Sequence, residues 1–238
     1  MKKLFRKLVK APFSFIKRVI YKTIIGPIKY RKKDDYDAER YWKDRFSKYG
    51  LSLKGSGNEG LSEKENKKRY LDLAEILTKI FTEESINFKS ANILDIGCGT
   101  GFFTEMFYDL KAKKYIGIDI TSVLFPRLRE KYSEYVFLKM DITSDNIEGK
   151  YDLILMIDVI EHIVNESKLI SAMENVKRSL NKEGVFIVAP LWKKNKKRLF
   201  YLKSWASSDL KQQFSDYIIK ENIELKEFQI PIIRNQQY

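Results

Sequence analysis

Asn92-Ile93-Leu94-Asp95-Ile96-Gly97-Cys98-Gly99-Thr100-Gly101 is the stretch that decides the fold of this 238-residue chain. It starts as a short apolar run, reaches an acid at Asp95, and then places glycine at every second position from Gly97 to Gly101. Such a run, closed by glycines, predicts a buried strand followed by a turn into a helix. Ligands of open α/β sheets bind beyond the carboxyl ends of strands. Glycines there allow positive φ and a close approach of the backbone. The stretch therefore predicts a ligand-binding turn.

The spacing of the glycines separates this turn from the dinucleotide-binding turn. The pattern G-x-G-x-x-G would need a third glycine at position 102, where this chain has Phe102. The carboxylate of Asp95, just before the first glycine, would repel a pyrophosphate and attract an ammonium group. S-adenosylmethionine (SAM) carries an ammonium group in its methionine moiety, so the turn favours SAM as the ligand.

The chain beyond residue 91 alternates between strand and helix patterns. Runs rich in Ile, Val, Leu and Tyr predict strands at 92–96, 114–119, 135–139, 151–157 and 184–189. Helices are expected near 102–110, 122–132 and 166–180, followed by a helix at 208–220, a strand at 223–230 and the start of another strand at 231–238. Strands that alternate with helices in this way form a parallel sheet in a three-layer sandwich. We therefore expect an α/β fold with a mostly parallel sheet flanked by helices.

On these motifs the chain resembles the class I SAM-dependent methyltransferases, over roughly residues 91–190. Further marks follow at the family's spacing: Tyr115–Asp119, Lys139–Ile142, Tyr151–Ile163 and Leu180–Val188. The D-x-x-E-H ending of the strand at 151–157 is similar to that of the quinone-biosynthesis O-methyltransferases. The resemblance implies a Rossmann-like fold, here with a helical N-terminal extension.

The resemblance also implies which positions hold SAM and its product S-adenosylhomocysteine. Asp95 and the glycines would hold the methionine end, and Asp119 would accept the ribose hydroxyls. Asp141 and Ile142 would meet the adenine, and Asp158 would close the pocket near the sulfonium. The positions expected to bind the cofactor are Asp95, Gly97, Gly99, Gly101, Asp119, Ile120, Asp141, Ile142 and Asp158.

Glu161 and His162 are the candidate catalytic residues, because they would lie beside the point of methyl transfer. An imidazole with an ordinary pKa near 6.5 can take a proton from an acceptor hydroxyl as the methyl group moves. In the alternative, His162 only orients its loop and the acceptor loses its proton to water. A metal held by Asp158, Glu161 and His162 is the less favoured option, and no metal site is expected.

Composition excludes several classes of protein. The chain has one cysteine, Cys98, which excludes a disulfide framework. It has one histidine, His162, which excludes a multi-histidine metal centre. No run free of Asp, Glu, Lys and Arg exceeds nine residues, whereas a membrane-spanning helix needs about 20 apolar residues. We expect a cytoplasmic protein in a reducing compartment, either free or peripheral on the cytoplasmic face of a membrane.

The positive charge is concentrated in residues 1–33. They contain 12 Lys or Arg and no acid, whereas the rest of the chain has 33 basic and 32 acidic residues. Apolar residues recur there at helical spacing from Leu4 to Ile24, and Pro12 is expected to divide the segment into two short helices. Residues 1–33, here called the basic arm, are basic and amphipathic, and such a segment suits an anionic membrane surface. Packing on the protein or a partner, and a targeting sequence, are the alternatives.

Residues 34–90 are predicted to form a helical cap, and residues 91–238 the SAM-binding domain. Tyr36–Tyr49 has a helical, aromatic pattern, and residues 50–60 hold four glycines, which predict a mobile loop. Ser62-Glu63-Lys64-Glu65 has the spacing of a capping box and opens a helix.

The expected function is methyl transfer to an oxygen of a membrane-associated small molecule, a lipid or a lipid-linked glycan. Five of the six residues in 193–198 are basic, which favours an anionic acceptor or surface, although a solvated loop is the alternative. One rival is an RNA or protein methyltransferase that binds through the basic arm, and another is a non-catalytic SAM-binding protein. Nucleic acid is less favoured because no RNA-binding module is recognisable. The sequence does not fix the oligomeric state.

Overall fold

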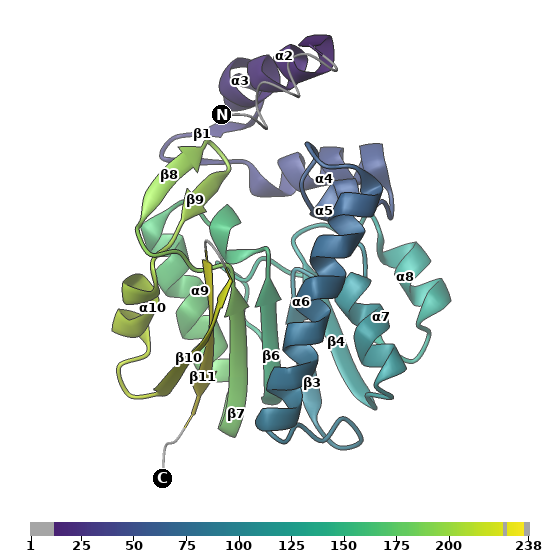
Figure 1. Cartoon of the computed structure of the whole chain (residues 1–238), viewed down its shortest axis with the longest axis vertical. Coiled ribbons are helices and arrows are strands. Elements are labelled where there is room, and N and C mark those ends of the chain that lie inside the picture. Colours follow the sequence, from purple (N-terminus) through teal and green to yellow (C-terminus); the bar gives the residue numbers. More distant parts are fainter. Residues whose placement is uncertain (1–11, 226–227, 236–238) are drawn as a thin grey trace.

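A seven-stranded sheet forms the centre of the computed structural model, which describes residues 12–225 and 228–235 (Figure 1). Its strand order is β10-β11-β7-β6-β3-β4-β5. The strands are β3 (Asn92–Ile96), β4 (Lys114–Asp119), β5 (Val136–Lys139), β6 (Tyr151–Ile157), β7 (Leu180–Ala189), β10 (Ile218–Leu225) and β11 (Phe228–Arg234). Strands β7 to β5 run parallel, and β11 is antiparallel to both of its neighbours. The predicted Rossmann-like, mostly parallel sheet is confirmed.

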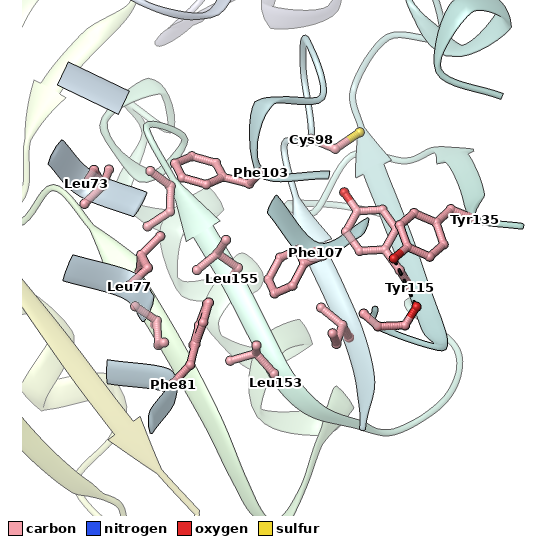
Figure 2. Packing of buried hydrophobic residues seen from close by; sticks show 14 of the residues in the cluster. Leu73, Leu77, Phe81, Cys98, Phe103, Phe107, Tyr115, Tyr135, Leu153 and Leu155 are labelled. Atoms are coloured by element: carbon pink, nitrogen blue, oxygen red, sulfur yellow. Dashed lines mark hydrogen bonds between the residues drawn. The ribbon is translucent and has the colours of Figure 1, made fainter. Parts of the chain in front are cut away.

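Helices cover both faces of this sheet. Because side chains alternate along a strand, β6 sends Leu153 and Leu155 to one face and Ile154 and Met156 to the other. The first face packs against α6 (Glu63–Glu83), α7 (Phe102–Asp109) and α8 (Phe125–Lys131), as Figure 2 shows in part. The second packs against α9 (Glu166–Ser179) and α10 (Ser207–Gln213). Each fully buried aliphatic or aromatic side chain in these layers stabilises the fold by about 1.5–3 kcal/mol.

The N-terminal extension is helical, as predicted, and lies beyond the carboxyl ends of the parallel strands (Figure 1). In order, it contains α2 (Pro12–Ile20), the π-helical turn η1 (Tyr21–Ile25), α3 (Gly26–Tyr30), the hairpin strands β1 (Arg31–Lys32) and β2 (Asp35–Tyr36), α4 (Ala38–Tyr49) and α5 (Leu53–Ser56). Residues 1–11 of the predicted basic arm lie outside the described residues. Within the described ranges, no helix is long and apolar enough to cross a membrane.

The predicted capping box at the start of α6 is present. Glu65 N donates to Ser62 Oγ at 3.2 Å, and Ser62 N donates to Glu65 Oε2 at 2.8 Å. Each of the two side chains thus accepts from the other residue's backbone N–H group, which would otherwise have no partner.

Three segments differ from their predictions. The glycine-rich stretch at 50–60 is not a continuous loop, because α5 forms within it and buries Leu53 and Gly55. The helix expected over 208–220 ends at Gln213, and the chain is already in β10 from Ile218, so the β10–β11 hairpin completes the sheet edge beside β7. The basic stretch at 193–198 enters a two-stranded hairpin made of β8 (Lys196–Leu199) and β9 (Leu202–Ser204).

Candidate active site

A cavity lies between the carboxyl ends of the parallel strands and the N-terminal cap. It encloses about 1000 Å³ of empty space, its open mouth included, which is in the range of small-molecule sites. Eight of the predicted site residues line it together: Gly97, Gly99, Asp119, Ile120, Asp141, Ile142, Asp158 and His162. The strand ends that position these residues are those of β3, β4, β5 and β6.

The glycine turn after β3 has no room for a side chain at Gly97 or at Gly101. Gly97 and Gly101 have φ of 76° and 80°. A Cβ atom on Gly97 would lie 2.2 Å from Val159 Cγ2, and one on Gly101 would lie 2.5 Å from Leu128 Cδ2. One side of the turn thus packs directly against Val159 and Leu128. On the other side, the backbone of Gly97 and Gly99 lines the cavity. Gly101 starts α7 and does not line the cavity.

Asp119 sits at the end of β4 with its carboxylate held by the backbone. Gly99 N donates to its Oδ2 at 3.1 Å, and Thr121 N donates to its Oδ1 at 3.0 Å. Burial raises the pKa of Asp119 to about 6, although these two hydrogen bonds favour the ionised form. A buried acceptor fixed at a strand end suits the hydroxyls of a ribose.

Asp141 and Ile142 form the next wall, after β5. Asp141 Oδ1 accepts from Thr143 N at 2.9 Å and from Thr143 Oγ1 at 2.7 Å, which fixes the turn. Ile120, Met140 and Ile142 add apolar surface beside it. A carboxylate next to aliphatic side chains suits a flat heterocycle that carries an amino group, such as adenine.

Asp95 does not line the cavity, so its carboxylate is not placed to meet an ammonium group directly. Residues alternate along β3, and Ile93 on the α7 side of the sheet puts Asp95 on that side too. There Tyr115 Oη donates to Asp95 Oδ2 at 2.7 Å, and Thr104 Oγ1 lies 2.7 Å from the same hydroxyl. Burial raises the pKa of Asp95 to about 7. The acid is therefore hydrogen-bonded within the protein interior, to Tyr115 of β4.

Asp158 follows β6 and lines the cavity with a positive φ of 57°. Its partner is Arg69 of α6, whose Nη2 lies 2.6 Å from Oδ1 and 2.7 Å from Oδ2. The Asp158 carboxylate raises the pKa of Arg69, so the guanidinium stays charged. Nothing in the sequence distinguishes Arg69 from the neighbouring surface lysines of its run.

His162 ends the 3-10 turn η2 (Ile160–His162) with its ring against the cavity. Its Nδ1 lies 2.9 Å from the carbonyl oxygen of Tyr201. A carbonyl only accepts, so Nδ1 carries the proton and Nε2 is left as an acceptor. Burial lowers the pKa of His162 to about 4. The ring is therefore neutral at pH 7, in the form that can take up a proton.

Glu161 is not part of the cavity lining, although it is close to His162. Its Oε1 lies 3.7 Å from His162 Nε2. Burial, together with the charge of Asp158, raises the pKa of Glu161 to about 8. In residues 12–225 and 228–235, no three His, Cys, Asp or Glu side chains are grouped to share a metal ion.

The cap contributes a wall that the motifs alone do not predict. Aromatic side chains from β2, α4 and α6 line the cavity: Tyr36, Trp42, Phe46 and Tyr70. Ser56 of α5 reaches the glycine turn, with its Oγ 3.1 Å from Thr100 Oγ1. For Tyr36, Trp42 and Phe46 the signal is the aromatic, helical pattern of Tyr36–Tyr49, which does not show what these side chains face.

The residues of the cavity fit SAM as the cofactor. The side-chain-free turn at Gly97 leaves space for close approach, Asp119 offers fixed acceptor oxygens, and Ile142 offers apolar contact. These would meet the methionine end, the ribose and the adenine, respectively.

Comparisons with known proteins show the family and the fold. Residues 65–225 match the methyltransferase domain family. Putative methyltransferase 235L of Invertebrate iridescent virus 6 is 27% identical over 172 residues, which are 67% of this chain and 65% of that protein. The chain thus spans less than two thirds of the length of this curated relative.

Two solved structures show the same fold. The magnesium protoporphyrin IX methyltransferase (ChlM) from Synechocystis PCC 6803 with bound SAM has a TM-score of 0.63 at 15% identity, covering 86% of this chain and 98% of that chain. The N-methyltransferase NodS from Bradyrhizobium japonicum WM9 has a TM-score of 0.51 at 16% identity, covering 74% and 97%. The family match includes the glycine turn, Asp119, Asp158 and His162, and extends over more than half of the chain. The chain therefore belongs to the methyltransferase domain family, whose cofactor is SAM.

Proposed function

We propose that the protein is a SAM-dependent methyltransferase that methylates an oxygen of a small, membrane-associated acceptor. The observation that carries this proposal is His162, a neutral imidazole on the cavity wall with Nε2 left as an acceptor. SAM supplies a methyl group activated by the positive charge on its sulfur. What the chain must add is a place for the acceptor and a destination for its proton.

The proton moves to His162 in this proposal. An acceptor hydroxyl donates a hydrogen bond to Nε2, and the oxygen becomes more nucleophilic as the proton leaves. The Tyr201 carbonyl holds Nδ1–H, which keeps the ring in the required tautomer and stabilises the imidazolium. A positioned base of this kind contributes about 10²–10⁴-fold in rate.

The acceptor in this proposal is apolar around its reacting oxygen. The ring of Trp42 lies 4.8 Å from that of His162, centroid to centroid, and Ile163 and Val164 continue the same wall. Such a wall favours an aromatic or lipid-like acceptor, because burying its apolar area contributes about 25 cal/mol per Å². A quinone-type phenol, a lipid headgroup or a lipid-linked glycan combines a hydroxyl with such apolar area.

The test is transfer of labelled methyl from SAM into fractionated extract of the source cells. We expect label in the organic-solvent or membrane-glycan fraction with the wild-type protein. His162→Asn keeps a donor for the Tyr201 carbonyl but provides no base, so it should reduce transfer by about 10²–10⁴-fold. Its affinity for SAM, measured by calorimetry, should stay within a few-fold of wild type.

Other outcomes overturn parts of the proposal. Label only in nuclease- or protease-sensitive material would replace the membrane acceptor by RNA or protein. SAM binding without transfer to any fraction would identify a non-catalytic binding protein. An Asp119→Asn variant, which should weaken SAM binding, is the control for cofactor-independent labelling.

A further inference from the structure

An exposed apolar row runs along α2, η1 and α3. Phe13, Ile24 and Ile28 are 81%, 54% and 76% exposed. The complete row is Phe13, Ile16, Val19, Ile20, Ile24, Ile25 and Ile28. These seven side chains are half of the fourteen large exposed hydrophobic side chains in the described part of the chain. Single exposed apolar residues are normal, but a row of this kind marks an interaction surface.

The opposite side of the same segment is fixed to the protein. Tyr30 is buried, stacks on Phe200 with ring centroids 6.1 Å apart, and donates to Asp44 Oδ2 at 2.9 Å. Its hydroxyl also lies 3.1 Å from Tyr21 Oη. Lys29 adds an ion pair of 2.7 Å with Asp44. The row is therefore the outer face of an anchored element, and the described residues do not bury it.

The charge around the row selects the kind of partner. Residues 12–33 contain seven Lys or Arg and no acid. A helical segment with apolar residues on one face and cations around it matches the interface of a bilayer that contains anionic lipids. A protein partner would need an acidic rim around an apolar groove to match the same features.

We propose that the face formed by Phe13, Ile16, Val19, Ile20, Ile24, Ile25 and Ile28 docks into the interface of an anionic bilayer. The segment would lie in the membrane plane, with its apolar side chains about 5–10 Å deep among the headgroups and acyl chains. Helices α2 and α3 lie at the end of the sheet where the cavity is (Figure 1). The hairpin that follows the arm supplies Asp35 and Tyr36 to the cavity lining.

Docking in this orientation gives a membrane-held acceptor a short path into the cavity. That consequence rests on the proposed function, whereas docking itself depends only on the arm.

The test is co-sedimentation of the full-length protein with lipid vesicles. Vesicles of phosphatidylcholine alone are compared with vesicles that also contain phosphatidylglycerol. We expect binding at least tenfold stronger to the anionic vesicles, and a loss with rising salt. A triple variant, Phe13→Ser, Ile24→Ser and Ile28→Ser, should bind at least tenfold more weakly, because it removes apolar area without changing charge.

The matched control replaces exposed apolar side chains elsewhere, by Leu71→Ser, Ile170→Ser and Ile218→Ser. It should bind vesicles as the wild type does. Equal binding by wild type and the arm variant would overturn the proposal, as would the absence of any binding to anionic vesicles. A change from oligomer to monomer in the arm variant, without vesicle binding by wild type, would make the face a protein interface instead.

A SAM titration of each variant separates this inference from the proposed function. The arm variant should bind SAM normally, since the row does not line the cavity. Vesicle binding without methyl transfer to any fraction would contradict the proposed function and leave docking intact. Methyl transfer without vesicle binding would contradict docking alone.

Discussion

Gly97 carries two constraints at once, a positive φ and a close neighbour. In Gly97→Ala, the left-handed backbone costs about 1–2 kcal/mol, and contact with Val159 at 2.2 Å adds about 1–3 kcal/mol of overpacking. We expect the free energy of unfolding, measured in urea, to fall by about 2–5 kcal/mol. SAM affinity, measured by calorimetry, should fall at least tenfold because the turn must shift.

Gly149 provides the matched control for the backbone cost alone. It has φ of 90°, but a Cβ atom there would meet nothing nearer than Tyr151 Oη at 3.5 Å. Gly149→Ala should therefore lose only about 1–2 kcal/mol and leave SAM binding unchanged. Equal losses of unfolding free energy in the two variants would mean that Val159 moves aside in Gly97→Ala at no measurable cost.

Asp95 should make the ligand-free protein less stable as the pH rises. Its pKa is about 7 in the folded protein and about 3.9 in an unfolded chain. Between these values the folded state holds a proton that the unfolded state lacks. The stabilisation is therefore complete below about pH 4 and lost as the pH rises through 7, with a slope of at most about 1.4 kcal/mol per pH unit.

The comparison with Asp95→Asn isolates that effect, because the amide does not titrate. The difference in unfolding free energy, wild type minus variant, should decrease from pH 5 to pH 7 and then level off. Urea unfolding at four pH values measures it. A difference that is flat over this range would show that Asp95 is already ionised in the folded protein.

At the scale of helices and strands, the sequence predicts the elements whose pattern is set by their own residues. The strand at Asn92–Ile96 and the capping box at Ser62 have the predicted positions. The short helix α5 could not be predicted, since its formation depends on packing Leu53 and Gly55 below α4. The early start of β10 depends likewise on pairing with β11, a contact that no local pattern contains.

The candidate site also contains residues that the sequence predicts and residues that it does not. Residues at strand ends, such as Asp119 and His162, can be found from sequence because topology alone brings strand ends together. Arg69 cannot, because its role depends on the rotation of α6 that turns it toward Asp158. The position of Asp95 behind the turn follows from alternation along β3, which the motif alone does not reveal.

The β8–β9 hairpin contacts Gly26 on one side and His162 on the other. A substitution at Gly26 should therefore affect His162. A Cβ atom on Gly26 would lie 2.6 Å from Phe200 Cε1, and the next residue, Tyr201, holds the imidazole. Gly26→Ala should reduce the free energy of unfolding by about 1–3 kcal/mol. It should also lower methyl transfer more than SAM affinity, because it disturbs the hairpin that orients His162.

A double-mutant cycle with Phe200→Ala checks the origin of that loss. Gly26 has φ of −61°, which alanine adopts freely, but its Cβ atom would still lie 2.9 Å from the carbonyl oxygen of Tyr21 once the ring is removed. Gly26→Ala should therefore lose less stability in the Phe200→Ala background than in the wild type, and the difference measures the contact with the ring. A loss of the same size in both backgrounds would exclude the contact as its cause.

At the scale of the whole molecule, charge and cavity lie at the same end of the sheet. Residues 12–33, which contain seven Lys or Arg and no acid, lie there together with the cap and the strand ends that line the cavity. An anionic surface would therefore attract this end of the molecule through those cations.

Bound SAM should hold the cap against the sheet, because residues of both line the cavity. Trp42 and Ser56 belong to the cap, whereas Gly97 follows β3 and Asp119 ends β4 of the sheet. At a SAM concentration 100 times its Kd, binding adds about 2.7 kcal/mol to stability. Trypsin cleavage within residues 34–60, mapped by mass spectrometry, should slow markedly. Cleavage at the basic residues of 17–33 should change little, and Asp119→Asn should abolish the protection at equal SAM. Uniform protection of both segments, or none in the cap, would mean that the cap takes no part in holding the cofactor.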